Sequence, residues 1–397
     1  MPKGCMAIAL AALFAFSPLY AQNNESDFNE KIKNILSTHF KKYKEAEYFT
    51  GVALSIELPN QAINNYYIGR VSHAENSKEI SKDTLFQIGS NTKSFTAAII
   101  LQLEKENKLT INDHLEKWLP QYNKWSIISV KQLLNMTSGI PNYSDLPLWS
   151  AKQYHHPGYV WTKTELVNYA YPPGNSNPPL KQGFFYSNTA YMLAGLIVEK
   201  VTNHSFTEEL RNRTIKRANL TNTFYSDANV DKKIQARLAI GYNYNQYDNP
   251  WLVGKEINHF NLSWAGAAGG VISNTEDLIK WTKALFVDNN VLEAAQQNEL
   301  TQLVSNNTGE AIQETTIDDP KGFGLGVAQL FDHDMGRIWF YEGETLGFRA
   351  LFMYKPCNGI IISSIFNSAT NSENDHAGEL LKAVYKSIIQ HHPNLSC

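Results

Sequence analysis

A hydroxyl and an amine stand three residues apart at Ser90 and Lys93, where the pattern predicts the start of a helix. Gly89 precedes the pair, and an apolar stretch with helical spacing follows it. Residues three apart share one face of a helix, so Nζ of Lys93 can reach Oγ of Ser90. A serine becomes a strong nucleophile when a neighbouring base takes its proton, and a lysine can be that base only when it is uncharged. Because burial and the positive end of a helix dipole both lower a lysine pKa, the two residues could form an activated nucleophile.

Ser90 and Lys93 also have a simpler interpretation, in which the serine caps a helix and the lysine is solvated one turn later. A second pair of residues favours catalysis. Tyr186 and Asn188 lie on a loop that enters the apolar helical run 192–201, and alternate residues of an extended loop point the same way. The phenol could then shuttle protons, while the amide could orient the amine or hold a substrate carbonyl. For Tyr186 alone, a partly buried core tyrosine is the alternative.

Several stretches in the same order resemble one family, the serine penicillin-recognising hydrolases related to class C β-lactamases, D-alanyl-D-alanine carboxypeptidases and family VIII carboxylesterases. Besides Ser90-x-x-Lys93 and Tyr186-x-Asn188, residues 128–141 contain Leu-Leu and Thr-Ser-Gly, and residues 268–278 contain a glycine pair before a helix. The resemblance implies an α+β fold of the β-lactamase/transpeptidase type, in which helices flank an antiparallel sheet and a mainly helical lobe is inserted. It also implies an acyl-enzyme mechanism without a cofactor.

The third element of the family differs in this sequence. Relatives carry Lys-Thr-Gly, His-x-Gly or Trp-x-Gly on a strand close to the nucleophile, whereas here Tyr341 takes the first place and Gly343 the last. Gly343 suits a position where an acyl group lies against the strand. The resemblance implies that the backbone N-H groups of Glu344 and Ser90 form an oxyanion hole. The Glu344 carboxylate is unexpected beside a developing negative charge, and it could point away into solvent.

The third element bears on the substrate. β-Lactams and peptides ending in D-alanine carry a carboxylate that Lys or His would bind there, and an aromatic residue is closer to the carboxylesterase branch. Arg349 is the nearest other cation, although a surface arginine paired with an acidic side chain is the alternative. No Lys-Thr-Gly and no Ser-Asp-Asn occurs, which argues against a class A β-lactamase arrangement.

These features predict a serine hydrolase acting on a D-amino-acid peptide, as a D-Ala-D-Ala carboxypeptidase does, or on a small ester. β-Lactams are the substrate class that ranks next. Its partners would be small-molecule or peptide substrates, including peptidoglycan fragments. The alternative is a penicillin-binding or cell-wall sensing module that acylates without turnover, or a degenerate member that only binds.

The composition fits a globular enzyme. The chain has 397 residues, of which 43% are hydrophobic and 18% charged, and its net charge is -3, so two lobes can share a cleft. The sequence contains no basic stripe of the kind that would indicate nucleic acid as a partner. No His-Glu-x-x-His and no glycine-rich phosphate loop before a helix occurs, so neither a metal nor a cofactor is expected.

Residues 1–21 have the pattern of a signal peptide: Lys3 is followed by an apolar run from Ala7 to Phe16 and by a small residue, Ala21, at a cleavage site. A retained membrane anchor is the alternative, but an apolar run of about ten residues is too short to span a bilayer. No later stretch is long and apolar enough to cross a membrane. We therefore expect a periplasmic or secreted protein.

Two cysteines, Cys357 and Cys397, follow the predicted signal peptide. In an oxidising compartment they could form a disulfide, which would stabilise the fold by roughly 4 kcal/mol in the chain-entropy account. Two free thiols or an intermolecular bond are the alternatives.

The predicted elements form two lobes. Residues 22–106 and 265–397 would build an α/β lobe around an antiparallel sheet, and residues 107–264 a mainly helical lobe. The aromatic-rich loop 242–251 could rim the cleft or simply decorate the surface. The sequence predicts helices over 27–46, 275–286 and 374–390, a hairpin over 48–71, and strands over 323–330, 337–341, 349–354 and 359–366.

Overall fold

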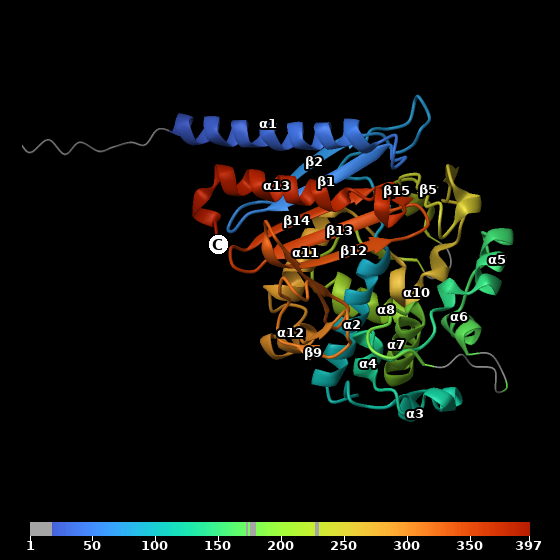
Figure 1. Cartoon of the computed structure of the whole chain (residues 1–397). Helices are drawn as coiled ribbons and strands as arrows, with labels where there is room; N and C mark the ends of the chain where they lie inside the picture. The colour runs from blue at the N-terminus through green and yellow to red at the C-terminus, as the bar shows by residue number, and fades with distance from the viewer. Residues whose placement is uncertain (1–17, 172–173, 175–179, 227–229) are drawn as a thin grey trace, which may run out of the picture.

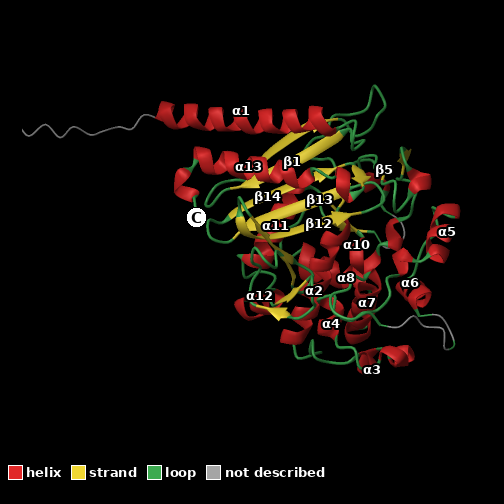
Figure 2. Ribbon diagram, viewed as in Figure 1, coloured by secondary structure: helices red, strands yellow, loops and turns green. Residues whose placement is uncertain are grey.

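The computed structural model describes residues 18–171, 174, 180–226 and 230–397 of the chain (Figure 1). Most of the predicted signal peptide, residues 1–21, and the proline pairs at 172–173 and 178–179 lie outside the described residues. The described part contains an antiparallel sheet with helices on both faces, and a group of helices beside it (Figure 2). This is the α+β architecture that the sequence predicts.

Nine strands of the described chain form the main sheet, and every neighbouring pair is antiparallel. In sheet order they are β2 (Asn64–Gly69), β1 (Gly51–Glu57), β14 (Ile360–Phe366), β13 (Arg349–Lys355), β12 (Gly336–Glu344), β11 (Ala328–Asp332), β10 (Lys321–Phe323), β8 (Leu303–Ser305) and β9 (Ala311–Ile312). The predicted hairpin β1–β2 is confirmed. The single strand predicted over 323–330 is wrong: the chain turns between β10 and β11, where Gly326 adopts φ +74.

Helices from the two ends of the chain cover one face of the sheet, and α11 (Thr275–Phe286) covers the other. Figure 1 shows α1 (Pro18–Tyr43) beside α13 (Ala377–His391). Ile32 and Leu36 of α1 and Leu380 and Val384 of α13 recur at helical spacing and are buried in one cluster with the apolar side chains of β1 and β14. Helices α1 and α13 therefore depend on each other for burial.

The helix that follows Ser90 lies among helices rather than on the sheet. Every residue of α2 (Thr92–Lys105) from Thr92 to Leu103 is buried, and a helix that is buried on all sides needs partners all round. It packs against α7 (Asn188–Thr202), α10 (Gly266–Gly269) and α12 (Ala294–Leu300). The predicted division at residue 106 thus separates α2 from α7 but keeps it in one lobe with α10 and α12.

Shorter elements complete the described chain. The other α-helices are α3 (Leu115–Trp118), α4 (Val130–Leu134), α5 (Pro147–His155), α6 (Lys163–Ala170), α8 (Phe206–Leu210) and α9 (Lys232–Gln235). Two small sheets have the orders β3 (Phe86–Gln87), β7 (Val271–Ser273), β4 (Phe224–Tyr225) and β15 (Ser368–Thr370), β5 (Tyr242–Tyr244), β6 (Lys255–Glu256). None of the described helices is both long enough and apolar enough to span a lipid bilayer.

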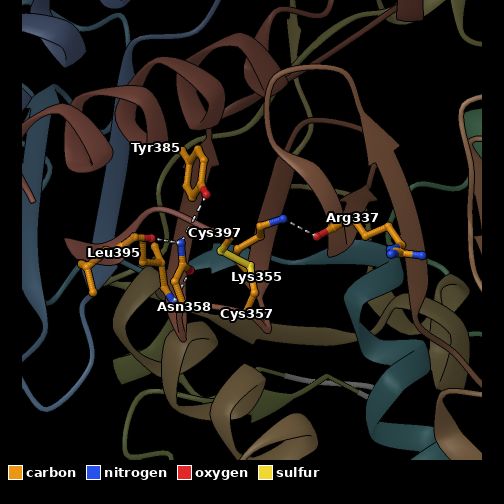
Figure 3. The surroundings of a disulfide bond; sticks show 8 residues. Arg337, Lys355, Cys357, Asn358, Tyr385, Leu395 and Cys397 are labelled. Carbon is orange, nitrogen blue, oxygen red and sulfur yellow. Dashed lines mark hydrogen bonds between the residues drawn. A yellow bond between two sulfur atoms is a disulfide. The ribbon is translucent and has the colours of Figure 1, made fainter. Parts of the chain in front are cut away.

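A disulfide joins Cys357 to Cys397, with their Cα atoms 6.0 Å apart. It links the turn between β13 and β14 to the residues that follow α13 (Figure 3). The neighbouring Asn358 strengthens the same connection, because its amide nitrogen donates to the Tyr385 hydroxyl at 3.2 Å and to the Leu395 carbonyl at 2.8 Å. Of the alternatives that the sequence leaves open, the structure has the intramolecular bond.

Candidate active site

Ser90 lies in a short 3-10 turn, Gly89–Asn91, that leads directly into α2. Gly89 has φ +50, and a Cβ atom there would lie 2.4 Å from the carbonyl oxygen of Glu344. Only glycine fits both the positive φ and this close approach. The turn therefore holds Ser90 against the end of β12.

Lys93 is fully buried beside Ser90. Its Nζ atom lies 2.9 Å from Ser90 Oγ, 2.8 Å from Asn188 Oδ1 and 3.0 Å from the carbonyl oxygen of Ala268. Burial lowers the pKa of Lys93, while the phenol of Tyr186 acts in the opposite direction. A neutral amine has two N-H donors and one lone pair, and the two carbonyl oxygens can only accept. The lone pair of the neutral amine is therefore left for the Ser90 hydroxyl.

Asn188 begins α7 and is held with its amide oxygen toward Lys93. Its amide nitrogen donates to Ser144 Oγ at 3.0 Å, and its backbone N-H donates to Asn142 Oδ1 at 3.0 Å. Sequence reasoning missed Asn142, Ser144 and the Ala268 carbonyl. The matching stretch 268–278 could have suggested Ala268, whereas no pattern indicated the other two.

Tyr186 contacts the nucleophile from the other side. Its hydroxyl lies 2.6 Å from Ser90 Oγ, and Lys93 Nζ lies 4.8 Å from the centre of its ring. The backbone N-H of Phe185 donates to the carbonyl of Met136 at 2.8 Å. The stretch 128–141 therefore positions the loop that carries Tyr186.

Tyr341 fills the position where relatives carry Lys, His or Trp. Its side chain is buried, and its hydroxyl lies 3.5 Å from that of Tyr186. Burial raises the pKa of Tyr341 well above its ordinary value, and the neighbouring Tyr186 adds to the rise. Tyr341 thus stays protonated and places a second phenol, without a charge, beside the first.

Gly343 allows a close approach within the protein itself. A Cβ atom at this position would lie 2.1 Å from the Ile88 carbonyl oxygen and 2.8 Å from the Asn91 backbone nitrogen. Glycine therefore lets β12 approach the backbone around the nucleophile.

The backbone of Glu344 lies where an oxyanion hole would need it. The N-H of Thr345 donates to the Phe348 carbonyl at 3.0 Å, and hydrogen bonds alternate along an antiparallel strand. The N-H of Glu344 therefore points to the opposite edge, where Gly89 lies. The N-H of Ser90 belongs to the first turn of a helix, whose donors lack intrahelical partners. The Glu344 side chain is exposed and lines the cleft.

Arg349 is not among the residues that line the cleft, and it is buried rather than on the surface, although it does pair with acidic side chains. Its side chain is fully buried, and its guanidinium lies 2.7 Å from Glu47 and 2.6 Å from Asp375. It also donates to the carbonyl of Ser368 at 3.0 Å. Because these partners occupy the guanidinium inside the protein, Arg349 holds together β13, β15 and the chain around α1 and α13.

The site opens into a cleft of about 960 Å³. Ser90, Tyr186 and Tyr341 line it together with Trp149 and Tyr247. The loop 242–251, for which the sequence left two interpretations, contributes to the rim through Tyr247 and its neighbours. Aromatic side chains and many polar or charged groups share its walls. In the described part of the chain, no group of three or more His, Cys, Asp or Glu side chains is arranged to hold a metal ion.

Comparison with known proteins decides the family. The sequence model of the family described as Beta-lactamase matches residues 36–386. The chain belongs to the beta-lactamase family. It is 26% identical over 326 residues to Penicillin-binding protein 4* of Bacillus subtilis, covering 80% of this chain and 68% of the relative. It is 27% identical over 321 residues to Protein flp of Staphylococcus aureus, covering 78% of this chain but only 57% of that relative.

Two solved structures share the fold of this chain. The D-amino acid amidase of Ochrobactrum anthropi SV3 has a TM-score of 0.77 at 24% identity, covering 92% of this chain and 99% of the amidase. The D-stereospecific amidohydrolase of Streptomyces sp. has a TM-score of 0.73 at 25% identity, covering 90% of this chain and 98% of the amidohydrolase. The chain is therefore a hydrolase of the β-lactamase and penicillin-binding protein superfamily, as the sequence predicts.

Proposed function

We propose that this hydrolase works through an acyl-enzyme formed on Ser90. The Ser90 hydroxyl passes its proton to the neutral amine of Lys93 while its oxygen bonds to the substrate carbonyl. The N-H groups of Ser90 and Glu344 stabilise the negative oxygen, and Asn188 keeps the amine in place. The leaving group departs with a proton supplied through Tyr186. Water then attacks the acyl group, gives a proton back to the same network and releases the acid.

One observation carries this proposal: the lone pair of a neutral Lys93 can only be directed at the Ser90 hydroxyl. Both other partners of Nζ, the Asn188 amide oxygen and the Ala268 carbonyl oxygen, are acceptors at 2.8 and 3.0 Å. A solvated lysine one turn after a capping serine would not be fully buried. The arrangement is what a general base for serine requires.

For the substrate, we propose a D-amino-acid peptide or amide, or a small ester. β-Lactams rank second as a substrate class. Solved relatives named D-amino acid amidase and D-stereospecific amidohydrolase support the first class. The uncharged Tyr341 gives the cleft no cation where relatives bind a substrate carboxylate. Peptidoglycan fragments would be natural sources of such D-amino-acid peptides.

A second candidate function is acylation without turnover, as in a penicillin-binding or cell-wall sensing protein. The relative named Penicillin-binding protein 4* and the replacement at Tyr341 support it. A degenerate, purely binding member is less well supported, because the hydrogen bonds of Ser90 with Lys93 and Tyr186 are intact.

Labelling and burst kinetics distinguish these functions. A fluorophosphonate probe should label the wild-type protein, and Ser90→Ala should abolish labelling while its circular dichroism stays unchanged. With p-nitrophenyl acetate, steady release means an enzyme, whereas one equivalent followed by silence means an acylated binder. If the protein neither releases p-nitrophenol nor takes up the label, the site is degenerate and the proposal is wrong.

We also propose that the chain acts outside the cytoplasm. Support comes from the charged, apolar and small-residue pattern of residues 1–21 and from the disulfide between Cys357 and Cys397. Amino-terminal sequencing of the protein purified from its native cells should begin at Gln22. An intact amino terminus on a protein found in the cytoplasm would contradict export.

A further inference from the structure

The end of β12 beside the nucleophile is paired with another strand along one edge only, within the described part of the chain. β13 pairs with β12 as far as Glu344, whereas β11 pairs with residues 336–340 alone. Beyond Phe340 the other edge faces the turn Gly89–Asn91, which carries Ser90. The N-H group that would complete the oxyanion hole thus lies on a strand end with a ladder on one side, so side-chain contacts must help to hold it.

Glu342 lies in this strand end, between Tyr341 and Gly343, and reaches the chain that precedes α13. Side chains alternate along a strand, so Glu342 lies on the opposite face from Tyr341. Its carboxyl group shares a hydrogen bond with that of Asp375. Oε1 of Glu342 is shielded from solvent, and no N-H or hydroxyl group of the described residues donates to it. The contact with Asp375 therefore joins the third element of the site to the segment that leads into α13.

A hydrogen bond between two carboxyl groups needs a proton on one of them. An ionised carboxylate can only accept, whereas a protonated carboxyl group has one O-H donor. Asp375 is stabilised as the anion, because its Oδ1 atom accepts from the Arg349 guanidinium at 2.6 Å and from the Ala377 backbone N-H at 2.9 Å. Glu342 must then hold the proton and donate it.

Other charged groups surround the pair. Arg349 of β13 contacts Asp375, and Glu47, from the chain after α1, lies 2.7 Å from the same guanidinium. His376 lies 2.8 Å from Glu47, and Glu344 stands two residues further along β12. One guanidinium is therefore set among several carboxyl groups, and a proton on one of them reduces their mutual repulsion.

The pKa of Glu342 reflects this environment. Burial raises it well above its ordinary value, and Asp375 and Glu344 raise it further, while Arg349 acts to lower it. A group with a raised pKa keeps its proton, and here its hydrogen bond, at every pH below that pKa. As pH rises through it, Glu342 becomes an anion and the two carboxylates repel each other. The strand end is then pushed away from the segment that holds it.

We propose that Glu342 is a positioning residue: as a neutral acid it donates to Asp375 and holds the end of β12 against the turn that carries Ser90. The inference rests on the proposed acyl-enzyme function and adds a condition to it. Glu342 acts through the backbone of Glu344, whose N-H group would bind the oxyanion. Loss of the Glu342 proton in alkaline solution should therefore remove activity even though Lys93 is then neutral.

The rate at which a fluorophosphonate labels Ser90, measured from about pH 6 to about pH 11, tests the inference. The wild-type rate should rise as Lys93 loses its proton and fall again at alkaline pH. Glu342→Gln keeps a donor for Asp375 that cannot ionise, so its fall should begin at least about one pH unit higher. Glu116→Gln, which changes an exposed glutamate of α3, should keep the wild-type profile.

A variant without a donor gives a second measurement. Glu342→Met should be labelled at least about tenfold more slowly than Glu342→Gln at the pH of the wild-type maximum, with circular dichroism showing that both are folded. If Glu342→Met does not fold, the two pH profiles of wild type and Glu342→Gln decide alone.

Three results would overturn the positioning role while leaving the serine hydrolase intact. They are an alkaline fall at the same pH in wild type and Glu342→Gln, a wild-type rate with no alkaline fall, and equal labelling of folded Glu342→Met and Glu342→Gln. A protein that is not labelled at Ser90 at any pH would instead contradict the acyl-enzyme itself.

Discussion

Lys93 Nζ lies 2.9 Å from Ser90 Oγ, and burial lowers the pKa of that amine. Because the base must be neutral, kcat/KM should be low at acidic pH and rise as pH increases through an apparent pKa below the usual value for lysine, about 10.4. Lys93→Arg keeps a positive charge that cannot be lost, so it should reduce kcat about 100-fold or more, as should Lys93→Met. An active Lys93→Arg variant would show that Lys93 is not the base.

The two phenols of the site should differ in importance. Tyr186 touches Ser90 Oγ at 2.6 Å, whereas Tyr341 reaches only Tyr186, at 3.5 Å. Tyr186→Phe should therefore lower kcat by about 100-fold or more, and Tyr341→Phe by less than about tenfold. Steady-state kinetics on one ester would measure both, and equal losses would mean that proton transfer also uses Tyr341.

Tyr341→His restores a residue that relatives use at this position. We expect the variant to gain kcat/KM on substrates that carry a carboxylate next to the reacting carbonyl, such as a cephalosporin, because the imidazole can donate to it. The ratio of cephalosporin to p-nitrophenyl acetate hydrolysis is the measurement. No gain would remove our explanation of the aromatic residue.

Gly343 should tolerate no side chain. In Gly343→Ala the new methyl group would meet the Ile88 carbonyl oxygen at 2.1 Å, so β12 must move away from Ser90. We expect a loss of about 1 to 3 kcal/mol in the free energy of unfolding, together with most of the activity. Gly378→Ala is the matched control, because α13 has open space there, and it should be neutral or stabilising by up to about 1 kcal/mol. Equal behaviour of the two variants in urea unfolding would refute this account.

Arg349 should contribute to stability rather than to substrate binding. Arg349→Met would leave Glu47 and Asp375 without their buried partner, which should cost about 3 to 5 kcal/mol. Arg337→Met, which removes an exposed arginine paired with Glu314, should change stability by about 0.5 kcal/mol or less. If Arg349→Met were as stable as wild type and raised only KM for a carboxylate substrate, the guanidinium would be a binding group after all.

The sequence predicts local features of this protein better than distant contacts. The spacing of Ser90 and Lys93 and the alternation of Tyr186 and Asn188 follow helix and strand geometry, so these four side chains could be placed in one site in advance. Helix α11 appears at the predicted bounds, because its apolar positions repeat at helical spacing.

Features that depend on the fold as a whole were missed or misjudged. The Ala268 carbonyl is a backbone atom, so no residue type indicates it. Arg349 pairs with Glu47, which lies 302 residues away along the chain, and with Asp375, which lies 26 residues away. No local pattern connects them.

The pairing of β1 with β14 places residues 51–57 next to residues 360–366. A ribosome therefore finishes nearly the whole polypeptide before the amino-terminal hairpin can find its neighbour in the sheet. Until then the hairpin and α1 keep their apolar sides uncovered, and two isolated strands are only marginally stable in water. A polypeptide truncated before residue 360 would therefore leave β1 without its neighbour on that side of the sheet.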